Sequence, residues 1–278
     1  MALSLITPEI VTLLNDWVCQ AGQIALRYFN RANPILKSDT TFLTQADIEI
    51  EKFLTQRIRL AFPNHNIVGE EGINNCLASS LENIWVIDPI DGTTAFVQGL
   101  PGWGISVGLL HRGQPYFGLY YMPLLGDLSY TSAQGQVMCN ELNLRGRLPT
   151  GWAPKGFLAV SASTHLEFQI YLSHMRALGS ISTNLVYTAR GSATAAFIPK
   201  AFLWDLVAGG AMISRVGGEL RYLSGQAVDY LSLLEGQLAP EPIVAGHPNV
   251  LDELPQMIRP YPVLPQLQGA GQKQVRIT

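Results

Sequence analysis

The apolar strand Ile84–Ile87 and the seven residues that follow it constrain this chain more than any other stretch. The strand runs directly into Asp-Pro-Ile-Asp-Gly-Thr-Thr, which holds two aspartates and two threonines beside a proline and a glycine. Pro89 fixes its own φ and has no N–H, and Gly92 permits backbone angles that other residues resist. The chain must therefore turn sharply at the end of a buried strand, where Asp88 and Asp91 can converge on one point.

Two converging carboxylates repel each other unless one is protonated or a cation lies between them. Mg²⁺ satisfies this requirement, because it is usually held by a few carboxylates together with water and phosphate oxygens. If a helix begins here, the N–H groups of Gly92, Thr93 and Thr94 form an anion-binding site beside the metal. The pattern predicts phosphoryl chemistry. The alternative is a capped turn in which Asp and Thr only satisfy backbone donors.

Length and charge exclude several other classes of protein. The 278 residues suffice for one large domain or two of ordinary size, and 47% hydrophobic against 14% charged residues predicts a substantial core. A net charge of −3 with mixed signs gives no basic stripe, so we expect no nucleic-acid partner. We also expect no membrane partner, because no apolar run has the length of a membrane span and no signal-type segment is visible.

The cysteines and histidines argue against disulfide and zinc chemistry. Cys19, Cys76 and Cys139 lack pair spacing, and their odd number argues against a disulfide framework. A cytoplasmic location is therefore expected. The five histidines show no i,i+4 metal spacing, so no zinc site is predicted.

Two helices are predicted ahead of the central stretch. Thr7-Pro8-Glu9 is a helix start, and apolar residues then recur at helical spacing until the chain approaches Asn33-Pro34. Thr44 and Asp47 form a capping box that opens a second helix, which is expected to end at Pro63. On these grounds alone Asp47 is a structural residue.

Further charged residues lie between these helices and the central stretch. The short strand Ile67–Val68 leads into Glu70 and Glu71, which either supply another carboxylate to the metal cluster or form a solvated acidic turn. Lys37 is either a solvated lysine or a charge close to the cluster.

Alternating strand and turn segments follow the central stretch and predict an antiparallel sheet. The expected strands are Gly104–Leu110, Tyr116–Tyr121 and Leu128–Thr131. Around Asn143–Pro154 the chain becomes rich in Gly, Pro, Arg and Thr, which predicts a domain boundary.

The second half alternates strand and helix, as α/β units do. The expected elements are a strand at Leu158–Val160, helices at His165–Leu178 and Thr183–Arg190, and a last helix from Trp204-Asp205 to Gly217-Gly218. Beyond Pro260 a loose tail is expected.

Taken together, Gly69-Glu70-Glu71, the Asp88–Thr94 run and Trp204-Asp205 resemble the inositol monophosphatase family of Mg²⁺-dependent phosphomonoesterases. The resemblance implies a layered α/β/α/β/α sandwich. Its N-terminal α+β domain, an antiparallel sheet with two helices, would span residues 1–145, and its C-terminal mixed-sheet α/β domain residues 146–278. It also implies inhibition by Li⁺ and a homodimer.

The resemblance also implies a role for each site residue. One Mg²⁺ would be bound by Glu70, Asp88 and the carbonyl of Ile90, a second by Asp88, Asp91 and Asp205, and a weaker third ion near Glu70. Glu70 and Thr94 would activate the attacking water, with Asp47 oriented toward Thr94. The phosphate would lie on the N–H groups of Gly92 and Thr93.

The substrate side departs from the family pattern. Gly179, Ser180 and Ile181 match a segment that contacts the substrate alcohol, but Ile198 stands where inositol-cleaving members usually carry an acid. Inositol phosphate is therefore one candidate substrate, and the alternatives are fructose 1,6-bisphosphate, histidinol phosphate and 3′-phosphoadenosine 5′-phosphate. Lys200 either meets a second anionic group or is an exposed lysine. A further alternative is a regulatory protein that keeps the metal site without turnover.

Overall fold

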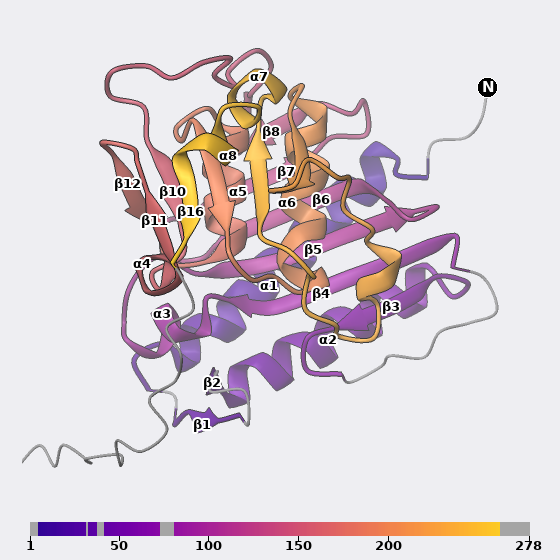
Figure 1. The fold of residues 1–278 in the computed structure, drawn as a ribbon. Helices are drawn as coiled ribbons and strands as arrows, with labels where there is room; N and C mark the ends of the chain where they lie inside the picture. The colour runs from indigo at the N-terminus through magenta and orange to yellow at the C-terminus, as the bar shows by residue number, and fades with distance from the viewer. Residues whose placement is uncertain (1–4, 32, 38–41, 73–80, 262–278) are drawn as a thin grey trace, which may run out of the picture.

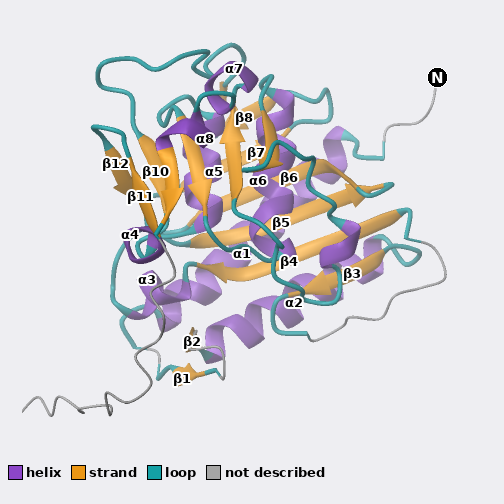
Figure 2. Ribbon diagram, viewed as in Figure 1, coloured by secondary structure: helices purple, strands orange, loops and turns teal. Residues whose placement is uncertain are grey.

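The computed structural model describes residues 5–31, 33–37, 42–72 and 81–261, which form five alternating layers of helices and sheets (Figures 1 and 2). The predicted layered sandwich is confirmed. In order, the layers are α1 (Pro8–Tyr28) and α2 (Gln45–Ala61), a seven-stranded sheet, α5 (Ile181–Ala189) and α6 (Leu203–Arg215), a five-stranded sheet, and the short helices α7 (Pro248–Leu251) and α8 (Leu254–Met257).

The seven-stranded sheet contains the central stretch. In spatial order its strands are β3 (Asn66–Gly69), β4 (Asn83–Asp91), β5 (Gly104–His111), β6 (Gln114–Met122), β7 (Asp127–Thr131), β8 (Val137–Cys139) and β9 (Leu142–Asn143). Neighbours are antiparallel as predicted, except that β3 runs parallel to β4. Parallel neighbours need a crossover rather than a tight turn.

The five-stranded sheet is mixed, as predicted. Its spatial order is β12 (Met175–Ala177), β10 (Leu158–Val160), β13 (Ala195–Ile198), β15 (Ile243–Gly246) and β14 (Glu219–Tyr222). The first three strands are parallel, and the last two pairs are antiparallel. The predicted division at residue 145 stays a prediction, because one buried cluster packs against both sheets.

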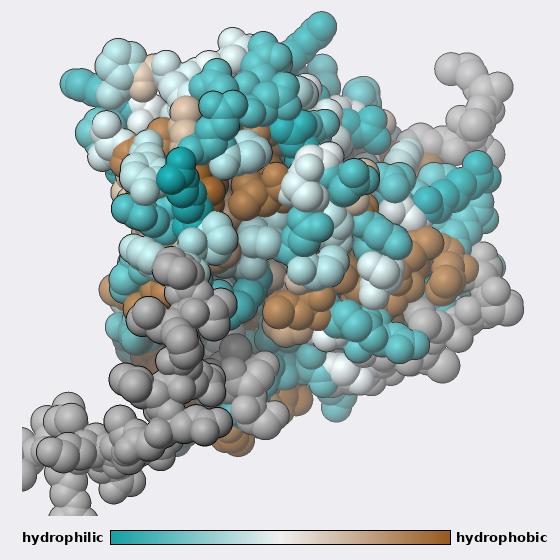
Figure 3. Space-filling view, viewed as in Figure 1, coloured by the Kyte–Doolittle hydropathy of each residue, from teal (hydrophilic) through white to brown (hydrophobic). Residues whose placement is uncertain are grey.

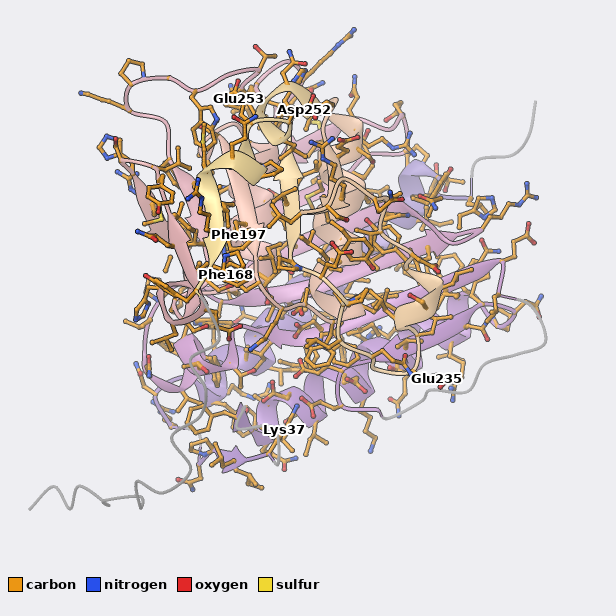
Figure 4. The ribbon with its side chains drawn as sticks, viewed as in Figure 1. Lys37, Phe168, Phe197, Glu235, Asp252 and Glu253 are labelled. Atoms are coloured by element: carbon orange, nitrogen blue, oxygen red, sulfur yellow. The ribbon has the colours of Figure 1, made fainter. Side chains whose placement is uncertain are left out.

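The helix predicted at His165–Leu178 is wrong. Only α4 (Thr164–Glu167) is helical, and it is followed by β11 (Phe168–Ile170) and β12. β11 pairs antiparallel with β16 (Ile258–Pro260), and Phe168 packs edge-on against Phe197 of β13 with ring centroids 5.0 Å apart (Figure 4). A strand partner some ninety residues away overrides the local helical pattern. The predicted tail lies mostly outside the described residues.

Local signals place the two N-terminal helices as predicted. The Thr7 hydroxyl accepts a hydrogen bond from the Ile10 N–H at 3.4 Å, and Thr44 and Asp47 form the expected capping box. The small pieces β1 (Ile35–Leu36) and β2 (Phe42–Leu43) pair between these helices. Cys19 and Cys139 are free thiols, whereas Cys76 lies outside the described residues.

Helix α6 lies very close to the seven-stranded sheet. A Cβ added to Gly118 of β6 would lie 2.1 Å from the Ala208 carbonyl oxygen, and one added to Gly108 of β5 would lie 2.5 Å from Val207. Only glycine permits this approach of backbone to backbone. It fixes the height of α6 above the sheet, and therefore the position of the residues at its first turn.

The surface mixes polar and apolar residues. Figure 3 shows hydrophobic residues in separate patches among polar ones on one face, which is ordinary for a folded domain. Within residues 5–261, as far as they are described, no helix combines the length and apolarity that crossing a membrane requires.

Candidate active site

Three buried carboxylates meet between the seven-stranded sheet and α6. Asp88, Asp91 and Asp205 each bring a carboxylate oxygen within 4.8 Å of the others, and their exposed fractions are 2%, 3% and 8%. The Asp88 Oδ1 atom is buried without a hydrogen-bond partner. Burying an unpaired carboxylate is costly. The donor set fits a hard divalent cation with oxygen ligands, and Mg²⁺ is such a cation.

An irregularity in β4 puts Asp88 and Asp91 on the same face. In a regular strand, residues three apart point to opposite faces. Here Asp88 pairs with Ser106 and Asp91 pairs with Gly104, so β4 carries one more residue than β5 over this interval. Such a β-bulge re-aims the side chain that follows it. Pro89 lies inside the bulge, where its missing N–H costs the sheet no ladder bond.

Glu70 reaches the cluster because β3 and β4 end side by side. Gly69 is in register with Ile87, and the Glu70 N–H donates to the Ile87 carbonyl at 3.1 Å. Glu70 therefore follows one strand where Asp88 continues the other. Lys37, labelled beside β1 in Figure 4, donates to Glu70 Oε1 at 3.0 Å and to Glu71 Oε1 at 2.7 Å. Lys37 is thus a charge next to the cluster rather than a solvated lysine.

Burial dominates the electrostatics of the cluster. Burial raises the pKa of Asp88, Asp91 and Asp205, and neighbouring negative charges raise the pKa of Asp88 and Asp205 further. Burial also raises the pKa of Glu70, and the ammonium group of Lys37 opposes that shift. The metal-free cluster therefore favours protonated carboxyls, and a bound divalent cation would remove that preference.

We expect the metal-free protein to lose stability as the pH rises from about 4 to about 7. A protonated carboxyl stabilises the folded chain when its pKa is higher there than in the unfolded chain. This contribution is complete below the unfolded-state pKa of about 4 and is lost as the pH rises through the folded-state pKa. For Asp47 burial raises that folded pKa to about 7. Thermal unfolding in EDTA across this range measures the effect. A melting temperature that rises steadily over the same interval would contradict it.

Asp47 caps the start of α2. Its Oδ2 accepts hydrogen bonds from the Thr44 N–H at 2.7 Å and the Thr44 hydroxyl at 2.6 Å, and its Oδ1 is buried without a partner. The orientation toward Thr94 is therefore not observed for these two described residues. The capping box uses the carboxylate for the start of α2 instead.

A cavity of about 640 Å³ opens onto the acidic cluster. All of the predicted site residues line it except Asp47 and Ile198. The predicted residues in its wall are Glu70, Asp88, Ile90, Asp91, Gly92, Thr93, Thr94, Gly179, Ser180, Ile181 and Asp205. Residues that the sequence did not single out also line it, among them Phe42, Val160, Ser161, Asn184, Phe202 and Leu238.

Ile198 has no contact with this cavity. It is fully buried and packs in the cluster between the two sheets. Successive residues of β13 face opposite sides of the sheet, and residue 198 falls on the side of α5 and α6. Lys200, two residues further on, does line the cavity, where its Nζ forms a 2.5 Å ion pair with Glu167 and both side chains remain about half exposed.

A short helix begins directly beside the aspartates. Gly92 adopts a left-handed conformation (φ 89°) and caps α3 (Thr93–Val97), whose first N–H groups have no partner inside the helix. The Thr93 hydroxyl donates to the Ile90 carbonyl at 3.0 Å, which leaves one lone pair of that oxygen for another donor or a cation. The helix start that the sequence predicted beside the aspartates is therefore present.

The sequence analysis missed the network that supports Asp91. The Ser182 N–H donates to Asp91 Oδ2 at 2.9 Å. The hydroxyl of Tyr120, fully buried on β6, lies 3.1 Å from the Ser180 hydroxyl and 2.8 Å from the Thr183 hydroxyl. No local signal marks Tyr120, because it stands in an apolar strand and its partners come from a different layer.

Close backbone contacts hold the two halves of the site together. A Cβ on Gly102 would lie 2.1 Å from the Leu178 carbonyl oxygen, and one on Gly179 would lie 2.3 Å from the Gly102 carbonyl oxygen. Gly179 also has φ 113°, which disfavours other residues. The segment that begins α5 is thereby pressed against the turn that carries Gly92.

Fold and site together define an α/β/α/β/α protein with a buried acidic centre of the kind that binds divalent metal. The sequence model of the inositol monophosphatase family matches residues 8–254. The chain belongs to this family.

Relatives and solved structures agree with this assignment. The chain is 28% identical over 254 residues to the Nus factor SuhB of Xylella fastidiosa, covering 86% of this chain and 90% of that protein. It is 29% identical over 255 residues to the inositol-1-monophosphatase of Bacillus subtilis, covering 87% and 93%. Among solved structures, the Thermotoga maritima IMPase has a TM-score of 0.74 at 22% identity, covering 90% and 96%. An IMPase/NADP phosphatase with Mg²⁺ and phosphate has a TM-score of 0.78 at 18% identity, covering 90% and 94%.

Proposed function

We propose that the protein hydrolyses a small phosphate monoester to an alcohol and inorganic phosphate with Mg²⁺ as its metal. The observation that carries this proposal is the buried cluster of Asp88, Asp91 and Asp205, which opens into a cavity also lined by Glu70 and the start of α3. A cluster of this kind beside free N–H groups suits an anionic substrate held together with a cation.

The ligands divide between two ions. Glu70, Asp88 and the Ile90 carbonyl would hold one Mg²⁺, and Asp88, Asp91 and Asp205 would hold a second, with a third weaker ion near Glu70. Bound Mg²⁺ supplies positive charge that neutralises the phosphate and acidifies water. The orphaned Oδ1 of Asp88 supports its place as the shared ligand.

The remaining residues position the reactants and move protons. Glu70 with the Thr94 hydroxyl would accept a proton from the attacking water, and the ammonium group of Lys37 favours the ionised form of Glu70 that this requires. The N–H groups of Gly92 and Thr93 would bind the phosphate. Gly179, Ser180 and Ile181 would border the alcohol part of the substrate, because they line the same cavity. Asp47 would act only through the start of α2.

The name of the Bacillus subtilis relative makes inositol 1-phosphate a first candidate substrate. The Xylella fastidiosa relative carries the name of a Nus factor, which keeps a regulatory role without turnover as the rival. Phosphate release should be measured from inositol 1-phosphate, fructose 1,6-bisphosphate, histidinol phosphate and 3′-phosphoadenosine 5′-phosphate, with Mg²⁺, with EDTA and with added Li⁺. Release that requires Mg²⁺ supports the proposal, and no release from any ester refutes it. Light scattering of the same sample would test the homodimer.

Removing one hydroxyl from the Asp91 network is expected to weaken the enzyme without unfolding it. Tyr120→Phe leaves the ring in place but takes away the group that Ser180 and Thr183 share. One lost buried hydrogen bond costs about 1 kcal/mol, so we expect about a fivefold rise in the Mg²⁺ concentration for half-maximal activity. Tyr121→Phe is the matched control, since the neighbouring side chain points away from this network and lies against Gly22 of α1. Equal Mg²⁺ requirements in both variants would count against the assignment.

A further inference from the structure

The wall of the cavity outside the acidic cluster contains a large set of apolar side chains. Besides Ile90 and Ala162, six hydrophobic side chains line it, contributed by five separate segments of the chain: Phe42, Val160, Ile181, Phe202, Trp204 and Leu238. The rings of Phe202 and Trp204 stack on each other with centroids 5.0 Å apart and planes 14° apart. Leu238 is 42% exposed, and it therefore offers apolar surface that the folded chain itself does not cover.

Few charged groups in this wall are placed to bind the hydroxyls of a polyol. Beyond the acidic cluster and Glu70, Glu71 is the one carboxylate among the described residues that line the cavity, and Lys37 already binds it at 2.7 Å. Ile198 occupies the core instead of supplying an acid. Lys200 is held by Glu167. The Asn184 amide nitrogen already donates to the Val160 carbonyl at 3.2 Å, so the Asn184 Oδ1 atom and the Ser161 hydroxyl are the neutral polar groups that this wall offers to a polyol.

The polar and apolar groups of this wall decide which alcohol part of a phosphate ester the cavity accepts. A polyol that enters an apolar wall gives up water at each hydroxyl, and every hydroxyl left unpaired costs about 1–3 kcal/mol. A flat hydrocarbon ring loses no hydrogen bonds on burial, and any flat aromatic ring gains contact with stacked aromatic side chains, worth about 0.5–1.5 kcal/mol beyond area burial. Both effects act in the same direction.

We infer that the cavity selects phosphate monoesters whose alcohol part carries a flat aromatic or heteroaromatic ring, in preference to polyol phosphates. This inference rests on the proposed phosphatase function. It assigns Phe202, Trp204 and Leu238 to the recognition of the leaving group.

Four esters separate the contributions. Benzyl phosphate and cyclohexylmethyl phosphate are both apolar primary esters, but only the first is flat, whereas inositol 1-phosphate is a polyol and 2′-AMP carries a heteroaromatic base. We expect kcat/KM at saturating Mg²⁺ to be at least tenfold higher for benzyl phosphate and 2′-AMP than for inositol 1-phosphate. We also expect benzyl phosphate to exceed cyclohexylmethyl phosphate by threefold or more.

The outcomes distinguish this inference from the function on which it rests. Turnover that favours inositol 1-phosphate, or that treats all four esters alike, would overturn the ring preference while leaving a phosphatase. No Mg²⁺-dependent release from any of them would remove the proposed function itself.

Substitutions in the wall test the assignment to residues. Phe202→Leu should lower the ratio of benzyl to cyclohexylmethyl turnover at least threefold, because it removes one ring of the stack and keeps an apolar side chain. Phe53→Leu is the matched control, since this half-buried ring lies on α2 beneath Arg57 and does not line the cavity. An unchanged ratio in Phe202→Leu, or an equal fall in Phe53→Leu, would contradict the role of the stack.

A second variant remains informative if Phe202→Leu folds poorly. Leu238→Asn changes an exposed side chain and adds an amide that can bind hydroxyls. We expect it to shift kcat/KM at least fivefold toward inositol 1-phosphate relative to benzyl phosphate. No shift in this variant would overturn the assignment of Leu238.

Discussion

Asp88→Asn is expected to abolish Mg²⁺-dependent phosphate release while leaving the chain folded. Asp88 meets Asp91 and Asp205 in the acidic cluster and also interacts with Glu70, so under the proposed function it is the carboxylate that two ions would share. Losing this charge removes about 4 kcal/mol or more of stabilisation in the transition state, which corresponds to about a thousandfold in kcat/KM. The side chain keeps its volume, and the packing of β4 is therefore unaffected.

The same substitution should stabilise the metal-free protein. The amide that replaces the Asp88 carboxylate carries no charge, so the repulsion among the buried carboxylates would fall, and in EDTA at about pH 8 the variant should melt above the parent. Asp16→Asn on the exposed side of α1 is the matched control and should change neither property. Turnover of Asp88→Asn within about tenfold of the parent would refute the shared-ligand role. A variant that is unfolded in EDTA would make Asp88 a structural residue instead.

The helices that local signals define could be predicted from the sequence. Thr7 and Thr44 each cap a helix through contacts within four residues, so the chain nearby contains all the information needed. The region His165–Leu178 shows the opposite case. Its apolar spacing suits a helix, but β11 takes its hydrogen-bond partners from β16, and no local pattern can reveal a pairing across the chain.

Part of the acidic cluster could be predicted from the sequence for the same reason. Asp88 and Asp91 stand close in sequence, and the Pro and Gly between and beside them indicate the turn that lets them converge. Asp205 was found through resemblance alone, because its approach depends on how deeply α6 packs against β5 and β6. Tyr120 could not be found at all, since it reads as one more apolar position of a strand and its function comes from hydroxyls on α5.

Gly118→Ala should show how much of the site depends on that packing. The added Cβ would lie 2.1 Å from the Ala208 carbonyl oxygen, a backbone atom that cannot rotate away. Either α6 moves or the sheet bends, and overpacking of this kind costs about 3 kcal/mol of unfolding free energy. Urea unfolding measures the loss. Gly151→Ala is the control, because no atom lies within 4 Å of the added Cβ, and we expect it to change stability by less than about 0.5 kcal/mol.

The displacement of α6 in Gly118→Ala should also change the geometry of the acidic cluster. Asp205 lies in the first turn of α6, where its Oδ2 accepts the Phe202 N–H at 2.6 Å, so the carboxylate moves with the helix. Because Asp88 and Asp91 belong to the sheet, lifting α6 separates them from Asp205. We therefore expect Gly118→Ala to need about tenfold more Mg²⁺ for half-maximal phosphate release even at temperatures where it is fully folded, the equivalent of about 1.4 kcal/mol. An unchanged Mg²⁺ requirement together with a large loss of stability would mean that Asp205 is positioned by the contacts of its own turn and not by the seating of α6 on the sheet.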